Sequence, residues 1–162
     1  MLFRSVKSPA GSELEYQKIG PLGRPHENFI NPENQWPCQQ PPWSSLIAVN
    51  ANTGEIAWKV PLGIVEELEA KGVHNTGAAF IMGGSIATGG GLIFIGATVD
   101  NYFRAFESRT GKMLWETKLK TSAHATPMTY QGKSGKQYVV IEAAGGRGRA
   151  AADDSIIAYT LP

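Results

Sequence analysis

Cysteine, charge and long apolar runs are all scarce in this sequence. Cys38 is the single cysteine of the 162 residues, which excludes an internal disulfide and a cysteine metal cluster. Charged residues make up 18% of the chain and the net charge is +1, whereas nucleic-acid-binding proteins usually carry a basic surplus, so no nucleic-acid partner is expected. No apolar run approaches the ~20 residues of a membrane-spanning helix, and the opening "MLFRSVKSPAGSELEY" lacks the apolar segment of a secretory signal.

Glycine and proline are plentiful instead, with 19 and 10 residues, which favours many short elements joined by turns. One short motif occurs twice, as "AVNANTGEIAW" from Ala48 to Trp58 and as "AFESRTGKMLW" from Ala105 to Trp115. Each copy has a strand-like run, a polar turn with Thr-Gly and a second strand that carries Trp. Glycine suits such a turn because it accepts positive φ without steric cost. The motif therefore predicts two β-hairpins with Trp at a matched position.

The remaining sequence also favours short strands. They are expected at about 85–88, 92–96, 102–107 and 113–119, and then at 125–130, 137–143 and 155–161. A short helix is expected at 63–72, which ends on a glycine. Four strands per repeat and a period of about 50 residues indicate a β-propeller. A β-sandwich or barrel also uses many short strands, but neither predicts a repeated hairpin with a matched Trp.

The expected fold is therefore all-β, a fragment of about two and a quarter propeller blades, where closed propellers have about 4–8. The expected organisation is a loop-rich N-terminal segment at 1–44 and a partial propeller at 45–162, with a hairpin at 45–62, a full blade at about 80–120 and an incomplete last blade at 124–162.

The repeated motif resembles the tryptophan-docking repeats of the pyrroloquinoline quinone (PQQ)-dependent dehydrogenases. "PCQQPPWSSLIAVNANTGEIAWKVPLG", "GGSIATGGGLIFIGATVDNYFRAF", "SAHATPMTYQGKSGKQYVVIEAAGG" and "DDSIIAYTLP" extend the resemblance over roughly Gly20 to Pro162. Together these stretches are similar to the C-terminal part of the membrane-bound glucose dehydrogenase type of quinoprotein. The resemblance implies an eight-bladed propeller with PQQ at its axis and a divalent metal, calcium or magnesium, beside the cofactor.

The resemblance also implies oxidation of an alcohol or a glucose-type sugar, with electrons passed to a ubiquinone-type acceptor. The compartment it implies is the bacterial periplasm, with inner-membrane attachment through a preceding part of the protein. In the family the catalytic base and the main metal ligands come from earlier blades, so no catalytic residue and no metal ligand is assigned here. This chain alone is expected to be inactive and to need the rest of the propeller.

Four loops are expected on one face of the propeller, because the loop that enters a blade and the loop between its second and third strands lie on the same side. The loops are 73–77, 98–101, 121–125 and 145–154. Asp100 matches a family loop whose Asp supports the cofactor pocket, whereas the other interpretation is an Asx-turn that bonds its own backbone. The two are compatible, with Asn101 as the turn residue.

Arg147 and His124 complete the candidate cofactor-binding residues. A guanidinium can bind a carboxylate of PQQ through two hydrogen bonds, and the glycines around Arg147 allow close approach. The family has Gly-Gly-His-Gly at this place, so Arg147 is a departure, and a solvated basic loop is the alternative. His124 either faces the channel or is a packed side chain, since the histidines show no metal-binding spacing.

Two further expectations concern the whole chain. A non-catalytic propeller that serves as a protein-interaction scaffold would keep Trp58 and Trp115, which are read here as packing residues. Open blade edges, including an unpaired strand near 155–161, predict self-association into a homo-oligomer.

Overall fold

The structure is a computed structural model that describes residues 4–8, 10–11, 16–19, 30–145 and 152–160. The chain forms two compact units, Met1–Cys38 and Gln39–Pro162. The first contains an antiparallel hairpin of β1 (Arg4–Lys7) and β2 (Tyr16–Ile19), two strands that the sequence does not predict within its loop-rich segment at 1–44. Strands of four residues are short enough to escape a pattern of alternation. None of the described helices is long and apolar enough to cross a membrane.

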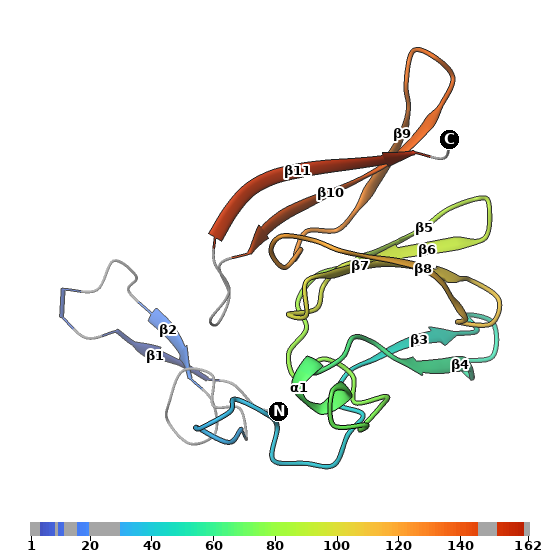
Figure 1. The fold of residues 1–162 in the computed structure, drawn as a ribbon. Coiled ribbons are helices and arrows are strands. Elements are labelled where there is room, and N and C mark those ends of the chain that lie inside the picture. Colours follow the sequence, from blue (N-terminus) through green and yellow to red (C-terminus); the bar gives the residue numbers. More distant parts are fainter. Residues whose placement is uncertain (1–3, 9, 12–15, 20–29, 146–151, 161–162) are drawn as a thin grey trace. The chain divides into compact units, whose positions relative to one another are not determined.

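Three antiparallel sheets make up the second unit (Figure 1). The first sheet is the hairpin of β3 (Ser45–Val49) and β4 (Ile56–Pro61). The middle sheet is ordered β5 (Ser85–Ala87), β6 (Leu92–Ile95), β7 (Tyr102–Glu107) and β8 (Met113–Lys118). The last sheet contains β9 (Met128–Gln131), β10 (Gln137–Gly145) and β11 (Ala152–Thr160). The expected all-β fold, a partial propeller, is confirmed.

Two apolar layers hold these sheets face to face. Between the first and middle sheets lie Leu62, Ile95, Ala97 and Phe106, with Leu46, Val60 and Ile93 packed against them. Between the middle and last sheets lie Phe103, Leu119, Ala123, Val139, Ile141 and Ala143. Residues alternate across a strand, so β10 turns Val139, Ile141 and Ala143 to one face. Strand β7 is buried on both faces because it lies inside the middle sheet, which has a neighbour on each side.

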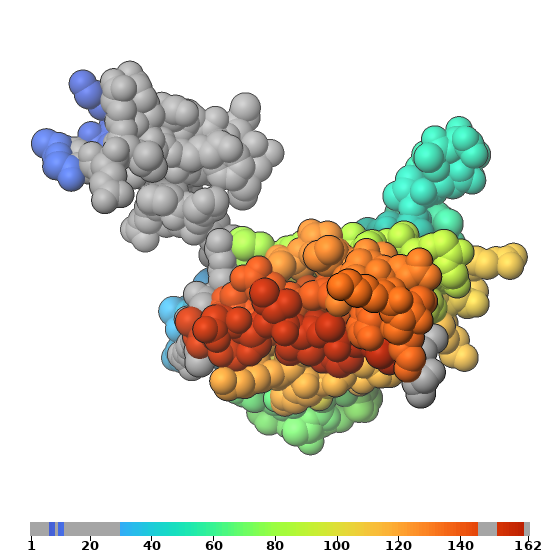
Figure 2. Space-filling model, turned by 90° about the horizontal axis from the view of Figure 1, so that it is seen from above, coloured from blue at the N-terminus to red at the C-terminus, as the bar shows by residue number. Residues whose placement is uncertain are grey.

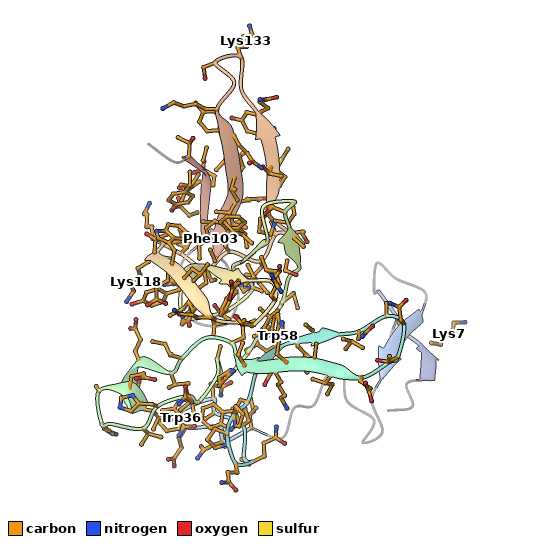
Figure 3. All side chains as sticks on the ribbon, turned by 90° about the vertical axis from the view of Figure 1, so that its right-hand side faces the viewer. Lys7, Trp36, Trp58, Phe103, Lys118 and Lys133 are labelled. Atoms are coloured by element: carbon orange, nitrogen blue, oxygen red, sulfur yellow. The ribbon has the colours of Figure 1, made fainter. Side chains whose placement is uncertain are left out.

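The two copies of the repeated motif contact each other. Gly111 lies in the turn after β7 with φ of 71°, and the six-membered ring of Trp58 lies against it. Figure 3 labels Trp58. The Trp58 indole N–H donates a hydrogen bond to the Ser108 carbonyl at 3.0 Å. Trp115 instead meets Phe103 and Tyr159 edge-on, at centroid distances of 6.0 and 5.3 Å. Both tryptophans therefore pack between neighbouring sheets.

Some boundaries differ from those expected. Helix α1 (Glu66–Glu69) is shorter than 63–72, because Gly63 has φ of 81° and Val65 is extended. Strand β9 begins at Met128 and not at Ala125, since the intervening Pro127 has no N–H for a ladder.

The compact units divide before Gln39, whereas the sequence placed a boundary after residue 44. Residues 43 and 44 bond into the second unit: Trp43 N–H donates to the Thr76 carbonyl, and the Ser44 hydroxyl donates to the Ala78 carbonyl. The assignment of residues to individual blades stays a prediction.

Candidate functional site

Backbone hydrogen bonds join the 121–125 loop to Gly145, the first residue of the 145–154 loop, and to Ala97, which precedes the 98–101 loop. Ala97 N–H, just before the 98–101 loop, donates to the Ala123 carbonyl at 2.6 Å. Gly145 N–H, at the end of β10, donates to the Ser122 carbonyl at 2.9 Å. A Cβ at Gly96 would come within 2.8 Å of the Ala123 carbonyl oxygen, so these backbones are in close contact. The candidate site therefore lies around the 98–101 and 121–125 loops.

Asp100 is buried, and its carboxylate accepts five hydrogen bonds. Oδ1 accepts from the Thr98 hydroxyl at 2.5 Å, from Tyr102 N–H at 3.1 Å and from Arg104 Nη1 at 3.2 Å. Oδ2 accepts from Ile64 N–H at 2.9 Å and from Arg104 Nη2 at 2.7 Å. The bond to Tyr102, two residues on, is the Asx-turn that the sequence offered as one interpretation. The bond to Ile64 joins the middle sheet to the segment that follows β4.

Arg104 is the functional candidate that sequence reasoning missed. Its side chain is 3% exposed and forms an ion pair with Asp100, and its Nε donates to Glu116 at 3.2 Å. The guanidinium also lies 4.8 Å from the centre of the Tyr102 ring. A buried charge is stable only when it is paired and hydrogen-bonded. The sequence does carry a signal for Arg104, a single arginine inside the otherwise apolar run "YFRAF". An arginine that is buried with its strand requires an acidic partner.

Gly63 lets the connection after β4 approach this ion pair. A Cβ at Gly63 would lie 2.9 Å from Asp100 Oδ2 and 2.7 Å from the Ala78 Cβ. The next part of the connection is held as well, because Val65 N–H donates to the hydroxyl of Thr76, which is fully buried. The Asp100 turn is thus enclosed by residues of the connection between β4 and β5.

Asn101 follows in a left-handed conformation, with φ of 66°. Its carbonyl accepts a hydrogen bond from Leu119 N–H at 2.7 Å, which ties the loop to the end of β8. In the described part of the chain its side-chain Oδ1 is buried and has no hydrogen-bond partner. An orphaned buried oxygen normally costs free energy, so it marks a place where a ligand's hydrogen-bond donor would fit.

His124 is half-buried and both of its ring nitrogens have partners. Nδ1 lies 3.0 Å from the Met82 carbonyl oxygen, which can only accept, so Nδ1 donates the proton. Nε2 lies 3.0 Å from the hydroxyl of Ser122, which is fully buried and donates to it when the imidazole is neutral. The His124 carbonyl is also packed closely, since a Cβ at Gly83 would lie 2.7 Å from its oxygen. His124 is therefore held in one orientation beside the 98–101 loop.

Two titratable groups near these loops have shifted pKa values. A hydrogen bond to Glu66 raises the pKa of the exposed Lys118 above its usual value, and this pair links α1 to β8. A hydrogen bond from the Ser155 hydroxyl lowers the pKa of Asp153, at the start of β11.

Arg147, the remaining candidate for cofactor binding, lies outside the described residues. Among the residues that are described, no three His, Cys, Asp or Glu side chains are grouped to hold a metal ion.

Comparison with known proteins identifies relatives for most of the chain. The family model "PQQ: Glucose/ethanol/alcohol dehydrogenase, beta-propeller domain" matches residues 4–139. Quinate/shikimate dehydrogenase (quinone) of Acinetobacter baylyi is 43% identical over 130 aligned positions, and the match covers 77% of this chain and 16% of the relative. Quinoprotein glucose dehydrogenase A of Acinetobacter calcoaceticus is 41% identical over 163 aligned positions, and the match covers 94% of this chain and 20% of the relative.

Among solved structures, a quinohemoprotein alcohol dehydrogenase from Pseudomonas putida HK5 aligns with 63% of this chain and 12% of its own length, at 31% identity and a TM-score of 0.49. The chain thus spans between about a sixth and a fifth of the length of the two curated relatives, at 16% and 20%.

Proposed function

Because this chain belongs to the PQQ-dependent glucose, ethanol and alcohol dehydrogenase family, we propose that it is the C-terminal part of the propeller of such an enzyme. Its substrate class is an alcohol or a glucose-type sugar, and its acceptor is a ubiquinone-type quinone. One relative is named as a dehydrogenase of quinate and shikimate, and another as a dehydrogenase of glucose. These three compounds all contain a hydroxylated six-membered ring. We extend that chemistry to this chain as a proposal.

The observation that carries this proposal is the buried turn at Asp100 and Asn101. The turn lies within residues 4–139, the part of this chain that matches the family model. When bound, PQQ supplies the two-electron oxidation of the alcohol, and a calcium or magnesium ion is the proposed metal beside it. The orphaned Asn101 Oδ1 fits a polar ligand at this turn. We propose that Asp100 supports the pocket wall, with Asn101, His124 and Arg147 as its other members. His124 then acts as an oriented polar group, and Arg147 binds a carboxylate of PQQ.

The proposal is tested on the full-length protein. Titration with PQQ in the presence of Ca²⁺ or Mg²⁺, followed by the absorbance of PQQ, should show saturable binding. The loaded protein should then reduce a ubiquinone analogue when glucose, quinate or glycerol is added, and the reaction should stop when PQQ is omitted. The 162-residue chain by itself should show no turnover. Absence of PQQ binding by the full-length protein would contradict the proposal.

A second candidate function, a non-catalytic propeller that binds another protein, is favoured by one observation. The polar atoms of Asp100 and His124 are satisfied by the chain's own groups, as they would be in a purely structural turn. PQQ titration separates the two functions, because a scaffold would neither bind PQQ nor be stabilised by it.

The periplasm is the proposed compartment, with the inner membrane reached through a preceding part of the protein. Cell fractionation of the natural host, with an antibody against this chain, tests the location. Recovery in the cytoplasmic fraction would contradict it.

A further inference from the structure

Asn101 is held in an arrangement that opposes folding in two ways. Its φ of 66° lies in the left-handed region, which Asn tolerates at a small cost and glycine adopts at none, and its Oδ1 is buried without a partner in the described part of the chain. Glycine at this position would remove both costs. Strained backbone and unpaired polar groups gather at binding sites, where a ligand makes use of them.

The neighbours of Asn101 hold it in this arrangement. Arg104 binds both carboxylate oxygens of Asp100, the residue before Asn101. Asp100 in turn accepts a hydrogen bond from Tyr102 N–H, on the other side of Asn101. Because Leu119 N–H also binds the Asn101 carbonyl, the backbone on both sides of the Asn101 side chain is fixed.

We propose, on the basis of the proposed function, that Asn101 is the residue of this turn that contacts the cofactor and that Arg104 is its positioning residue, acting through Asp100. An amide oxygen accepts hydrogen bonds, so Oδ1 takes a donor, and the ring N–H of PQQ is a donor of that kind. Asp100 makes no such contact, because its carboxylate, with room for about four hydrogen bonds, already accepts five. For the same reason Asp100 is not a cation ligand.

Substitution of Asn101 by glycine should change the affinity for PQQ and the stability of the protein in different directions. In the full-length protein, Asn101→Gly should weaken PQQ binding about 10-fold, the effect of losing one hydrogen bond in a buried site. Its melting temperature without PQQ should be equal to that of the wild type or higher, since the strain and the orphaned oxygen are gone. Gln35→Gly is the matched control, because Gln35 also has a left-handed backbone, with φ of 63°, and is exposed in the first unit. It should leave PQQ affinity unchanged.

A double-mutant cycle tests the positioning role of Arg104. Arg104→Lys keeps the charge but loses the two-pronged contact with Asp100, so it should lower both the melting temperature and PQQ affinity. In the Asn101→Gly background the same change should still lower the melting temperature, yet PQQ affinity should fall no further. A residue that only supports the fold would lower affinity equally in both backgrounds. Affinity for Ca²⁺ alone should be the same in all four proteins.

The possible results distinguish this inference from the proposed function. If the wild type does not bind PQQ, the proposed function is wrong, and this inference is wrong with it. If the wild type binds PQQ and Asn101→Gly binds it equally well, the proposed function stands and the contact at Asn101 is refuted. If Asn101→Gly weakens binding but the effects of the two substitutions simply add, the positioning role of Arg104 is refuted. Altered Ca²⁺ affinity in Asn101→Gly would make the ligand a cation instead of the cofactor.

Discussion

At the scale of single residues, the two hairpin turns contain glycines in matched positions with different surroundings. Gly54 and Gly111 have φ of 76° and 71°, so both occupy the left-handed region. A Cβ at Gly111 would lie 2.6 Å from the Trp58 ring, whereas a Cβ at Gly54 would meet nothing within 4 Å. Substitution of Gly54 therefore tests the cost of the left-handed backbone alone, whereas substitution of Gly111 also tests the contact with Trp58.

Gly111→Ala should destabilise the chain more than Gly54→Ala. Both substitutions cost about 1 kcal/mol through the left-handed backbone. Gly111→Ala should cost a further ~1–3 kcal/mol, because the ring of Trp58 must move away. Chemical denaturation of the two variants and the wild type measures the difference. Equal losses in the two variants would show that the Trp58 contact contributes nothing to stability.

Asp100 illustrates how a residue with a proposed functional role can be essential to the fold. Asp100→Asn removes the charge that compensates the buried Arg104, and should lower the free energy of unfolding by about 3–5 kcal/mol. Glu116→Gln is the control, because Glu116 also binds Arg104 but is 41% exposed, and it should cost less than ~1 kcal/mol. Thermal melts of both variants test this. A wild-type melting temperature for Asp100→Asn would mean that the buried pair is not required for folding.

At the scale of the element, β7 is the strand on which the packing depends. Phe103 on this strand, labelled in Figure 3, is fully buried. The centre of its ring lies 6.1 Å from that of Phe94, 6.0 Å from that of Trp115 and 5.8 Å from that of Tyr159. The Phe103 side chain thus joins the middle sheet to β11 of the last sheet.

Phe103→Ala should destabilise the second unit by about 3–5 kcal/mol, the usual result of removing a buried aromatic ring. Met113→Ala on β8 is the control, since Met113 is 45% exposed and should cost much less. Urea denaturation followed by far-ultraviolet circular dichroism gives both values. Similar values for the two variants would contradict the assignment of Phe103 to the core.

At the scale of the whole molecule, the second unit exposes apolar side chains on its first and last sheets. Ile47, Val49 and Ile56 on the first sheet are 44%, 58% and 60% exposed. Met128, Tyr130 and Ile156 on the last sheet are 56%, 45% and 75% exposed. Strand β11, drawn in red in Figure 2, has β10 as its partner among the described strands, so it forms an edge of its sheet. Exposed edges and apolar faces of this kind recruit further strands.

The isolated chain should therefore self-associate. Sedimentation equilibrium at high micromolar concentration should give a mass above 17.4 kDa. Ile156→Lys should shift the equilibrium toward monomer with little effect on the melting temperature, because this side chain is mostly exposed and a charge on an edge strand opposes pairing. A clean monomer of the unsubstituted chain would reject the prediction and would show that its open faces are already protected.

Sequence reasoning was most successful where structure depends on neighbours along the chain. The repeated "NTG" and "RTG" turns contain glycines with positive φ, and the strands on either side were predicted close to their observed bounds. The family was also recognised from linear motifs, since the resemblance requires no knowledge of contacts.

The sequence by itself determined the all-β class, the hairpins, the blade-like repeat and the family. The tertiary structure alone decided which groups meet: Trp58 with Gly111, Asp100 with Arg104 and Ile64, and His124 with Met82. Among the residues that the structure describes, it also left the Asn101 oxygen without a partner, which no pattern of residue types could indicate. The physical reason is range: turns and strands follow from steric preferences within a few residues, whereas a buried charge or amide is satisfied by whichever distant segment the packing of the sheets brings beside it.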